Sequence, residues 1–322
     1  MWNKVSIWLL VLLFAACTKK AEVELPVVLC APMPEGRASA AACVLNGKAY
    51  VFGGRDQSGK AHNDLWEYNP ETNIWTKVAV CPGKQRVRAV AIGYNNALYL
   101  GLGFTNTNLF KDSCYLRDWW RYSPQTNTWD SLAEYIQGTT VSPIPYVVGE
   151  RLYTIYGSNG GFSRTMIYYT PSNNTWTKEE DSSLRAKSGL GGCGVQVQGR
   201  CFYGLGFNTS NLDQWYEVDL PTDKWTKRTF LSEKGRSLCA CCGTDEYVYI
   251  FGGRCFRGEL TGGEVFNEYY RYNVADDKWE FCGSMPCGRA ENQIAFTLNG
   301  KAYFGLGEDS EGKIINQLYR IE

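Results

Sequence analysis

The stretch Arg37–Trp75, RASAAACVLNGKAYVFGGRDQSGKAHNDLWEYNPETNIW, carries the pattern that decides the fold of this chain. Its first two apolar runs are separated by Asn46-Gly47, which predicts a tight hairpin because both central turn residues need positive φ. The second run ends at Gly53-Gly54, where the missing side chains permit a bend or a close backbone approach. A third run, Leu65–Tyr68, enters a polar turn and leaves it at Trp75.

This pattern returns five times along the chain. The second run recurs at steps of 49, 54, 49, 47 and 54 residues, beginning at Tyr50, Tyr99, Tyr153, Phe202, Tyr249 and Tyr303. The turn with its tryptophan recurs at Trp129, Trp176, Trp225 and Trp279. With these tyrosine, glycine and tryptophan marks the unit resembles the Kelch repeat, which implies one four-stranded blade of a β-propeller per repeat. A β-sandwich with coincidental periodicity is the alternative.

The two ends of the chain complement each other. Residues 22–34 (EVELPVVLCAPMP) resemble the last quarter of a repeat, and residues 289–321 supply the other three quarters. We therefore predict an all-β, six-bladed Kelch-type propeller over residues 24–322, with the N-terminal strand as the outer strand of the sixth blade. Such closure removes two exposed sheet edges. In the third repeat, Pro143 and Pro145 predict a distorted first strand, because proline lacks a ladder donor.

The first residues differ from the rest. A cationic start is followed by the largely apolar run Val5–Ala16 and then by Cys17. These features predict a signal peptide over residues 1–16. They also resemble a bacterial lipobox, which implies lipidation of Cys17, a tether over residues 17–23, and export to the outer membrane on a face that the sequence does not specify. A secreted protein without lipid and an uncleaved anchor are the alternatives.

Composition narrows the function classes. Lys plus Arg and Asp plus Glu both number 33, so we expect no nucleic-acid surface. The body has no apolar run long enough to span a bilayer, so contact with a membrane is expected through Cys17 alone. Of the twelve further cysteines, Cys239, Cys241, Cys242 and Cys255 crowd the fifth repeat without CxxC spacing, and His62 is the single histidine. We expect no metal, no cofactor and a monomer, with free thiols and one or two disulfides near the fifth blade.

Two recurring positions are candidates for ligand binding at the loop face of the channel. Arginines precede the aromatic residue of the second run by thirteen or fourteen positions: Arg37, Arg86, Arg236 and Arg289. Converging guanidiniums favour a carboxylate, sulfate or phosphate. The alternative is that they are framework residues that join the blades. The residue directly after the glycine strand varies instead between aromatic and charged types: Arg55, Phe104, Ser158, Phe207, Arg254 and Glu308. Such a set suits a sugar or a peptide, and simple loop tolerance is the alternative.

Two enzyme families share this propeller class. Resemblance to galactose oxidase would imply copper held by tyrosines and two histidines, which a chain with one histidine cannot supply. Resemblance to the sialic-acid mutarotases implies a glutamate and an arginine after a glycine strand, of which Gly307-Glu308 supplies only the glutamate. We therefore expect a binding module for a glycan or an envelope protein. The alternative is a sugar-modifying enzyme, such as an N-acetylneuraminate mutarotase or epimerase, with Glu308 or Glu291 as the base.

Overall fold

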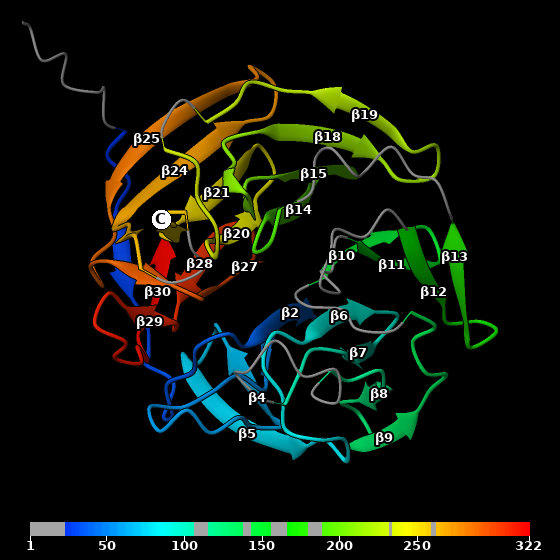
Figure 1. Cartoon of the computed structure of the whole chain (residues 1–322). Coiled ribbons are helices and arrows are strands. Elements are labelled where there is room, and N and C mark those ends of the chain that lie inside the picture. Colours follow the sequence, from blue (N-terminus) through cyan, green and yellow to red (C-terminus); the bar gives the residue numbers. More distant parts are fainter. Residues whose placement is uncertain are drawn as a thin grey trace, which may run out of the picture.

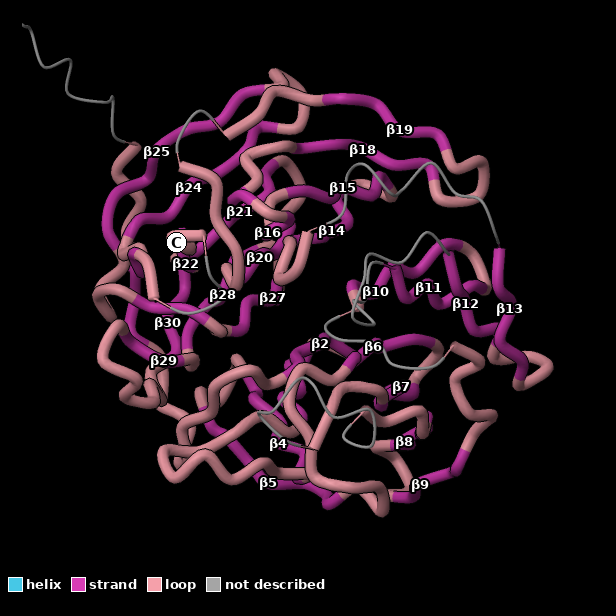
Figure 2. Tube along the Cα trace, viewed as in Figure 1, coloured by secondary structure: helices cyan, strands magenta, loops and turns pink. Residues whose placement is uncertain are grey.

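Six antiparallel sheets of four strands surround a common axis (Figure 1). The computed structural model describes residues 23–105, 115–137, 143–155, 166–179, 189–231, 234–258 and 262–322. Cys17 and the expected signal peptide lie outside these residues. Figure 2 shows that the described chain consists of strands joined by loops and turns. In this part of the chain, no helix reaches the length and apolarity needed to cross a membrane.

Blades 1 to 5 each take their four strands from one repeat. From the axis outward, the strands of the first three blades are β2 (Ala41–Leu45), β3 (Lys48–Phe52), β4 (Asp64–Asn69) and β5 (Ile74–Val80); β6 (Val90–Tyr94), β7 (Ala97–Gly101), β8 (Trp119–Ser123) and β9 (Thr128–Ser131); and β10 (Ile144–Val148), β11 (Arg151–Ile155), β12 (Met166–Thr170) and β13 (Thr175–Glu179). Those of the next two are β14 (Cys193–Val197), β15 (Arg200–Gly204), β18 (Trp215–Asp219) and β19 (Lys224–Lys227); and β20 (Ala240–Gly243), β21 (Tyr247–Phe251), β24 (Glu268–Asn273) and β25 (Lys278–Ser284). The innermost strands contact one another in sequence around the axis, so the ring is closed.

The sixth blade is built from both ends of the chain. Its strands are β27 (Ile294–Leu298), β28 (Lys301–Gly305), β30 (Leu318–Ile321) and, outermost, β1 (Val27–Leu29). Val27 pairs with Ile321, and the Cys30 amide donates to the Leu318 carbonyl at 2.8 Å. The predicted fold class is confirmed, including closure by the N-terminal strand.

The first strand of the third blade is regular, so the expected distortion is wrong for the residues described. β10 pairs with β11 at every position from Ile144 to Val148. Both backbone groups of Val147 bond the Gln196 side chain of the next blade, so Val147 faces the open edge of the sheet. Pro145, two residues earlier, faces the same edge. Its missing N–H therefore removes no bond of the ladder.

The recurring turn and tryptophan hold neighbouring blades together. The Trp75 indole donates to the Ala31 carbonyl at 2.9 Å, while the Asn73 side chain accepts from the Ala31 amide at 2.8 Å. Tyr68 donates its hydroxyl to the same Asn73 oxygen. Asn73 has φ of 56°, which asparagine tolerates better than most residues. Trp176 and Trp279 repeat the clamp on Ala133 and Thr229.

Candidate functional site

Three of the predicted ligand-binding arginines are buried framework residues. Arg37, Arg86 and Arg236 are each at most 1% exposed. Arg86 forms a bidentate pair with Asp118, at 2.8 and 2.6 Å, and also donates to the Leu102 carbonyl. Arg86 and Arg236 thus join the inter-blade loop to the ends of the second and third strands of their own blade, and Arg37 joins it to Asp64 of the third strand. Their burial keeps them from a ligand at the channel mouth, which corrects the first prediction.

Arg289 lies outside this framework position. The pairing of β26 (Ala290–Glu291) with β29 (Glu308–Asp309) shows that Ala290 takes the place of the framework arginine in blade 6. Arg289 instead donates to the Val265 carbonyl at 2.6 Å, and its side chain is 50% exposed. The sequence spacing therefore predicted the framework position of blade 6 one residue too early in the chain.

The residue after the glycine strand occupies an equivalent place in five blades. Each one pairs in antiparallel fashion with a residue of the preceding inter-blade loop: Ala38 with Arg55, Val87 with Phe104, Leu190 with Phe207, Ser237 with Arg254, and Glu291 with Glu308. The glycine before it is required, because a Cβ on Gly54 would lie 2.9 Å from the Ala38 carbonyl oxygen. Ser158 lies outside the described residues.

The two aromatic members of this set pack against other side chains. Phe104 is 3% exposed and contacts Val87 and Tyr115. Phe207 is half-buried, with its ring centroid 5.3 Å from that of Phe256. Phe104 therefore cannot stack on a sugar, contrary to the prediction, whereas Phe207 keeps part of its side chain exposed.

The charged members meet in one cluster. Glu291 and Glu308 are directly opposite each other across the β26–β29 pair, and both are buried. Arg254 of blade 5 bonds Glu291 with two nitrogens, at 2.7 and 2.5 Å. Arg55 of blade 1 bonds Glu308. Two like charges face each other here because an arginine from each flanking blade neutralises one of them.

Two residues that sequence reasoning missed extend this cluster toward the axis. The side-chain Nδ2 of Asn292 donates to Glu308 at 2.8 Å, and Arg88 of blade 2 donates to the side-chain Oδ1 of Asn292 at 3.3 Å. Burial lowers the pKa of Arg88, while the charges of Glu291 and Glu308 act in the opposite direction. Arg88 follows the framework arginine by two positions, where the other blades have small or uncharged residues. That difference is the signal that could have identified it.

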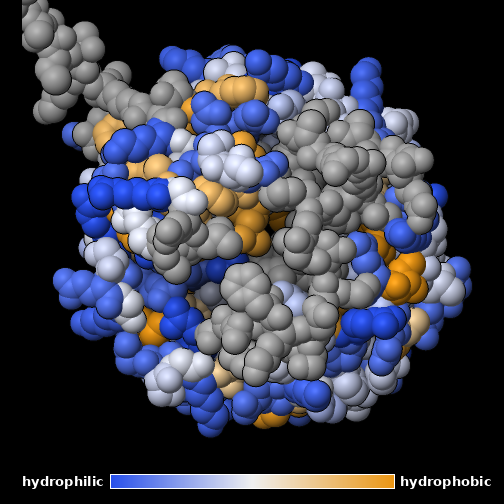
Figure 3. Space-filling model, viewed as in Figure 1, coloured by the Kyte–Doolittle hydropathy of each residue, from blue (hydrophilic) through white to orange (hydrophobic). Residues whose placement is uncertain are grey.

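The backbone of five blades forms a hydrogen-bonded arc around the axis at this position. Five residues with φ between 51° and 66° contribute to it: Ser39, Arg88, Gly191, Leu238 and Asn292. Neighbours among them are joined by bonds of 2.8 to 3.0 Å, from Arg88 to Ser39, Ser39 to Asn292, Asn292 to Leu238, and Leu238 to Gly191. All five line a cavity of about 210 Å³. Figure 3 shows the centre of this face hollowed, with hydrophobic and hydrophilic surface beside the hollow.

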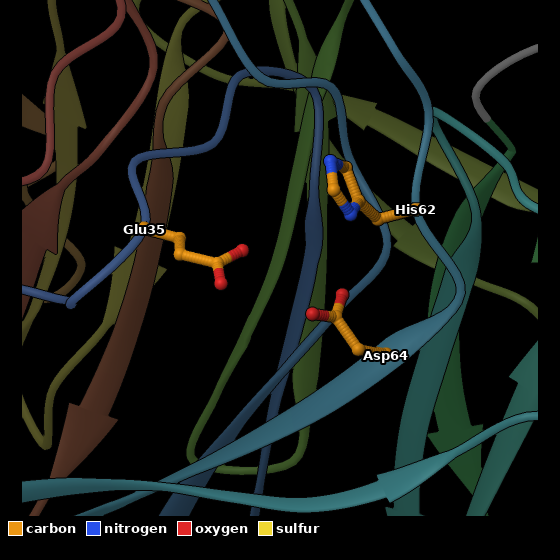
Figure 4. Close-up of side chains that lie close together, drawn as sticks. All are labelled: Glu35, His62 and Asp64. Atoms are coloured by element: carbon orange, nitrogen blue, oxygen red, sulfur yellow. The ribbon is translucent and has the colours of Figure 1, made fainter.

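A second group of ionisable residues lies at the start of β4. Glu35, His62 and Asp64 each bring one potential metal-ligand atom within 4.8 Å of the others (Figure 4). Arg37 bonds both Glu35, at 2.6 Å, and Asp64, at 3.1 Å, and Lys77 lies 3.1 Å from the same Asp64 oxygen. Side-chain cations already balance these carboxylates, so we assign the group to the framework.

Comparison with known proteins agrees with this architecture. The family described as "KLHDC2/KLHL20/DRC7 Kelch-repeats domain" matches residues 12–144, and the "Kelch motif" family matches residues 147–182 and 235–286. This chain is a Kelch-repeat β-propeller.

N-acetylneuraminate epimerases and Kelch-like proteins are among the similar proteins. N-acetylneuraminate epimerase of Pasteurella multocida is 26% identical to this Kelch propeller, over 87% of the chain and 88% of the epimerase. Kelch-like protein 35 of Mus musculus is 23% identical over 84% of the chain, which spans only 44% of the mouse protein. The solved structure titled "Structure of YjhT" has a TM-score of 0.73 at 16% identity, covering 90% of this chain and 96% of that one. That likeness concerns the fold alone.

Proposed function

We propose that the channel mouth of this propeller binds an acidic sugar. The main support is the cluster of two opposed glutamates, which are held by Arg55 and Arg254 from different blades. Asn292 connects this cluster to Arg88. Three guanidiniums against two carboxylates leave one net positive charge, because each arginine carries +1 and each glutamate −1. This surplus is suited to one ligand carboxylate.

The same cluster suits the hydroxyl groups of a sugar. Carboxylates accept hydrogen bonds from hydroxyls, and guanidiniums bind carboxylates with two parallel bonds. Arg55 and Arg254 are partly exposed, with side-chain accessibilities of 23% and 18%, whereas the glutamates behind them are buried. An entering ligand would therefore meet the arginines first and the glutamates through rearrangement of these pairs.

The test is ligand-dependent thermal unfolding of residues 23–322. The panel contains neutral sugars, sialic and uronic acids, and sulfated oligosaccharides. A ligand at a hundred times its Kd adds about 2.7 kcal/mol of stability, which raises the Tm measurably. We expect a shift with the carboxylated sugars. A panel without any shift would contradict the proposal and favour a protein partner.

A variant that tests the binding site must not leave a buried charge unpaired. Arg254→Ala alone would strand Glu291, and a buried carboxylate without its partner destabilises the fold. The double variant R254A/E291Q removes the pair together, and we expect it to weaken acidic-sugar binding about tenfold or more. The control is R121A/D130N, which removes an exposed pair at 2.8 Å on blade 2 and should leave binding unchanged.

An enzymatic role is the second candidate. It is favoured by the opposed carboxylates of Glu291 and Glu308 and by the epimerases that match this chain over most of their length. Interconversion of sugar anomers needs a group that takes the proton of the anomeric hydroxyl as the ring opens, and Glu308 or Glu291 could take it. NMR exchange spectroscopy of N-acetylneuraminate anomers tests this. Faster exchange with the parent than with E308Q or E291Q is expected, and a parent rate equal to that of the protein-free solution would exclude the activity.

We further propose that the chain is exported and held at the outer membrane through lipid on Cys17. The supporting observation is the cationic start, the apolar run and the small residues before that cysteine. The test is labelling with a fatty acid followed by membrane fractionation. We expect the parent to incorporate the label and to fractionate with membranes, and C17S to do neither. Unlabelled parent protein would contradict the anchor.

A further inference from the structure

Two thiols of adjacent blades meet beside the channel. Cys193 begins β14 of blade 4, and Cys239 directly precedes β20 of blade 5; Figure 1 shows these two strands side by side near the axis. Their Sγ atoms lie 3.0 Å apart, about 1 Å longer than a disulfide bond. The backbone bond from Leu238 to Gly191, 2.8 Å long, holds the two segments together at the same level.

The two cysteines differ in access and in charge environment. Cys193 is 2% exposed, whereas Cys239 is partly exposed and lines the axial cavity. The two sulfurs share a hydrogen bond in which either can donate, and this bond, together with the positive charge of Arg236, lowers the pKa of Cys239. Cys239 is thus both reachable from the cavity and the better placed of the two to form a thiolate.

We propose that Cys193 and Cys239 are a redox-active pair that closes to an inter-blade disulfide in the wall of the channel. A low-molecular-weight disulfide is the oxidant. The Cys239 thiolate attacks one of its sulfurs and releases the first thiol, and Cys193, after losing its proton, attacks Cys239 in the mixed disulfide and releases the second. Two protons leave the cysteines, and two electrons reduce the oxidant to two thiols. The pairing does not depend on the sugar proposed above.

Cys241 is the competing thiol on the same wall. It also lines the cavity and interacts with Cys193, but its Sγ donates to the Gly194 carbonyl at 3.3 Å, and the interaction of Cys193 with Cys239 is the stronger of the two. The short Sγ–Sγ distance therefore favours Cys239 over Cys241 as the disulfide partner of Cys193. A link between positions 46 residues apart restricts the unfolded chain, so closure should raise the Tm by a few degrees.

The experiment treats the native, reduced protein with bis(2-hydroxyethyl) disulfide, blocks the remaining thiols with N-ethylmaleimide in denaturant, and maps the peptides by mass spectrometry. We expect a linked peptide containing Cys193 and Cys239 in the parent and in the control C241S, and no such peptide in C193S or C239S. The oxidised parent should also melt higher than the reduced one, with no shift in C239S.

Two results would overturn the pairing. One is an oxidised parent in which both Cys193 and Cys239 are still alkylated, and the other is a link from Cys193 to Cys241. Because the parent map alone decides between these outcomes, a serine variant that fails to fold does not affect the conclusion.

Discussion

At the scale of single residues, two arginines of similar sequence context have opposite roles. Arg86 is fully buried in its bidentate pair with Asp118, whereas Arg289 is half exposed and bonds a carbonyl. We expect Arg86→Ala to lower the free energy of unfolding by about 3–5 kcal/mol, because Asp118 loses its buried partner. Arg289→Ala should cost about 0–1 kcal/mol. Urea unfolding of both variants is the measurement, and equal losses would disprove the framework assignment.

At the scale of one element, blade 4 carries a ladder of charges across three strands. Glu217 on β18 bonds Arg200 on β15 at 2.7 Å and also Arg228 beyond β19, and these hydrogen bonds lower its pKa to about 2. A lowered carboxyl pKa stabilises the fold above the ordinary value near 4.5, and this contribution disappears as the pH falls toward 2. We expect Glu217→Gln to cost about 1 kcal/mol at pH 7 and progressively less below pH 4.5. Unfolding midpoints across this range, with D130N as the control, test it; a constant difference would contradict the ladder.

At the scale of the whole molecule, the ring of blades is closed by the three residues of β1 and by the segment that follows this strand. β1 covers the outer edge of β30, and Cys30 and Met33, which follow it, are 6% and 0% exposed. A protein starting at residue 35 loses these contacts. Burial of a large apolar side chain contributes about 1.5–3 kcal/mol, so we expect a loss of several kcal/mol and a tendency to aggregate through the open edge. Calorimetry against a protein starting at residue 23 measures this, and equal melting temperatures would refute closure.

Much of the architecture follows from local sequence. The number of blades, their four-strand composition and the closing strand could be read from the repeats, because turns, glycines and apolar alternation act within some fifty residues. The regularity of β10 could not be predicted from the repeats. Pro145 is tolerated because it faces the open edge of the sheet, and Gln196 of the next blade covers that edge.

Part of the candidate site could be predicted from the sequence, and the rest only from the tertiary structure. The sequence by itself pointed to Arg55, Arg254 and Glu308, because the residue after each glycine strand varies between aromatic and charged types, and it named Glu291 only as an alternative base. Only the tertiary structure showed that Arg37, Arg86 and Arg236 are buried, that Asn292 bonds Glu308, and that Arg88 bonds Asn292. The physical reason is that a repeat is a local pattern, whereas the site forms where side chains from four repeats converge on one axis.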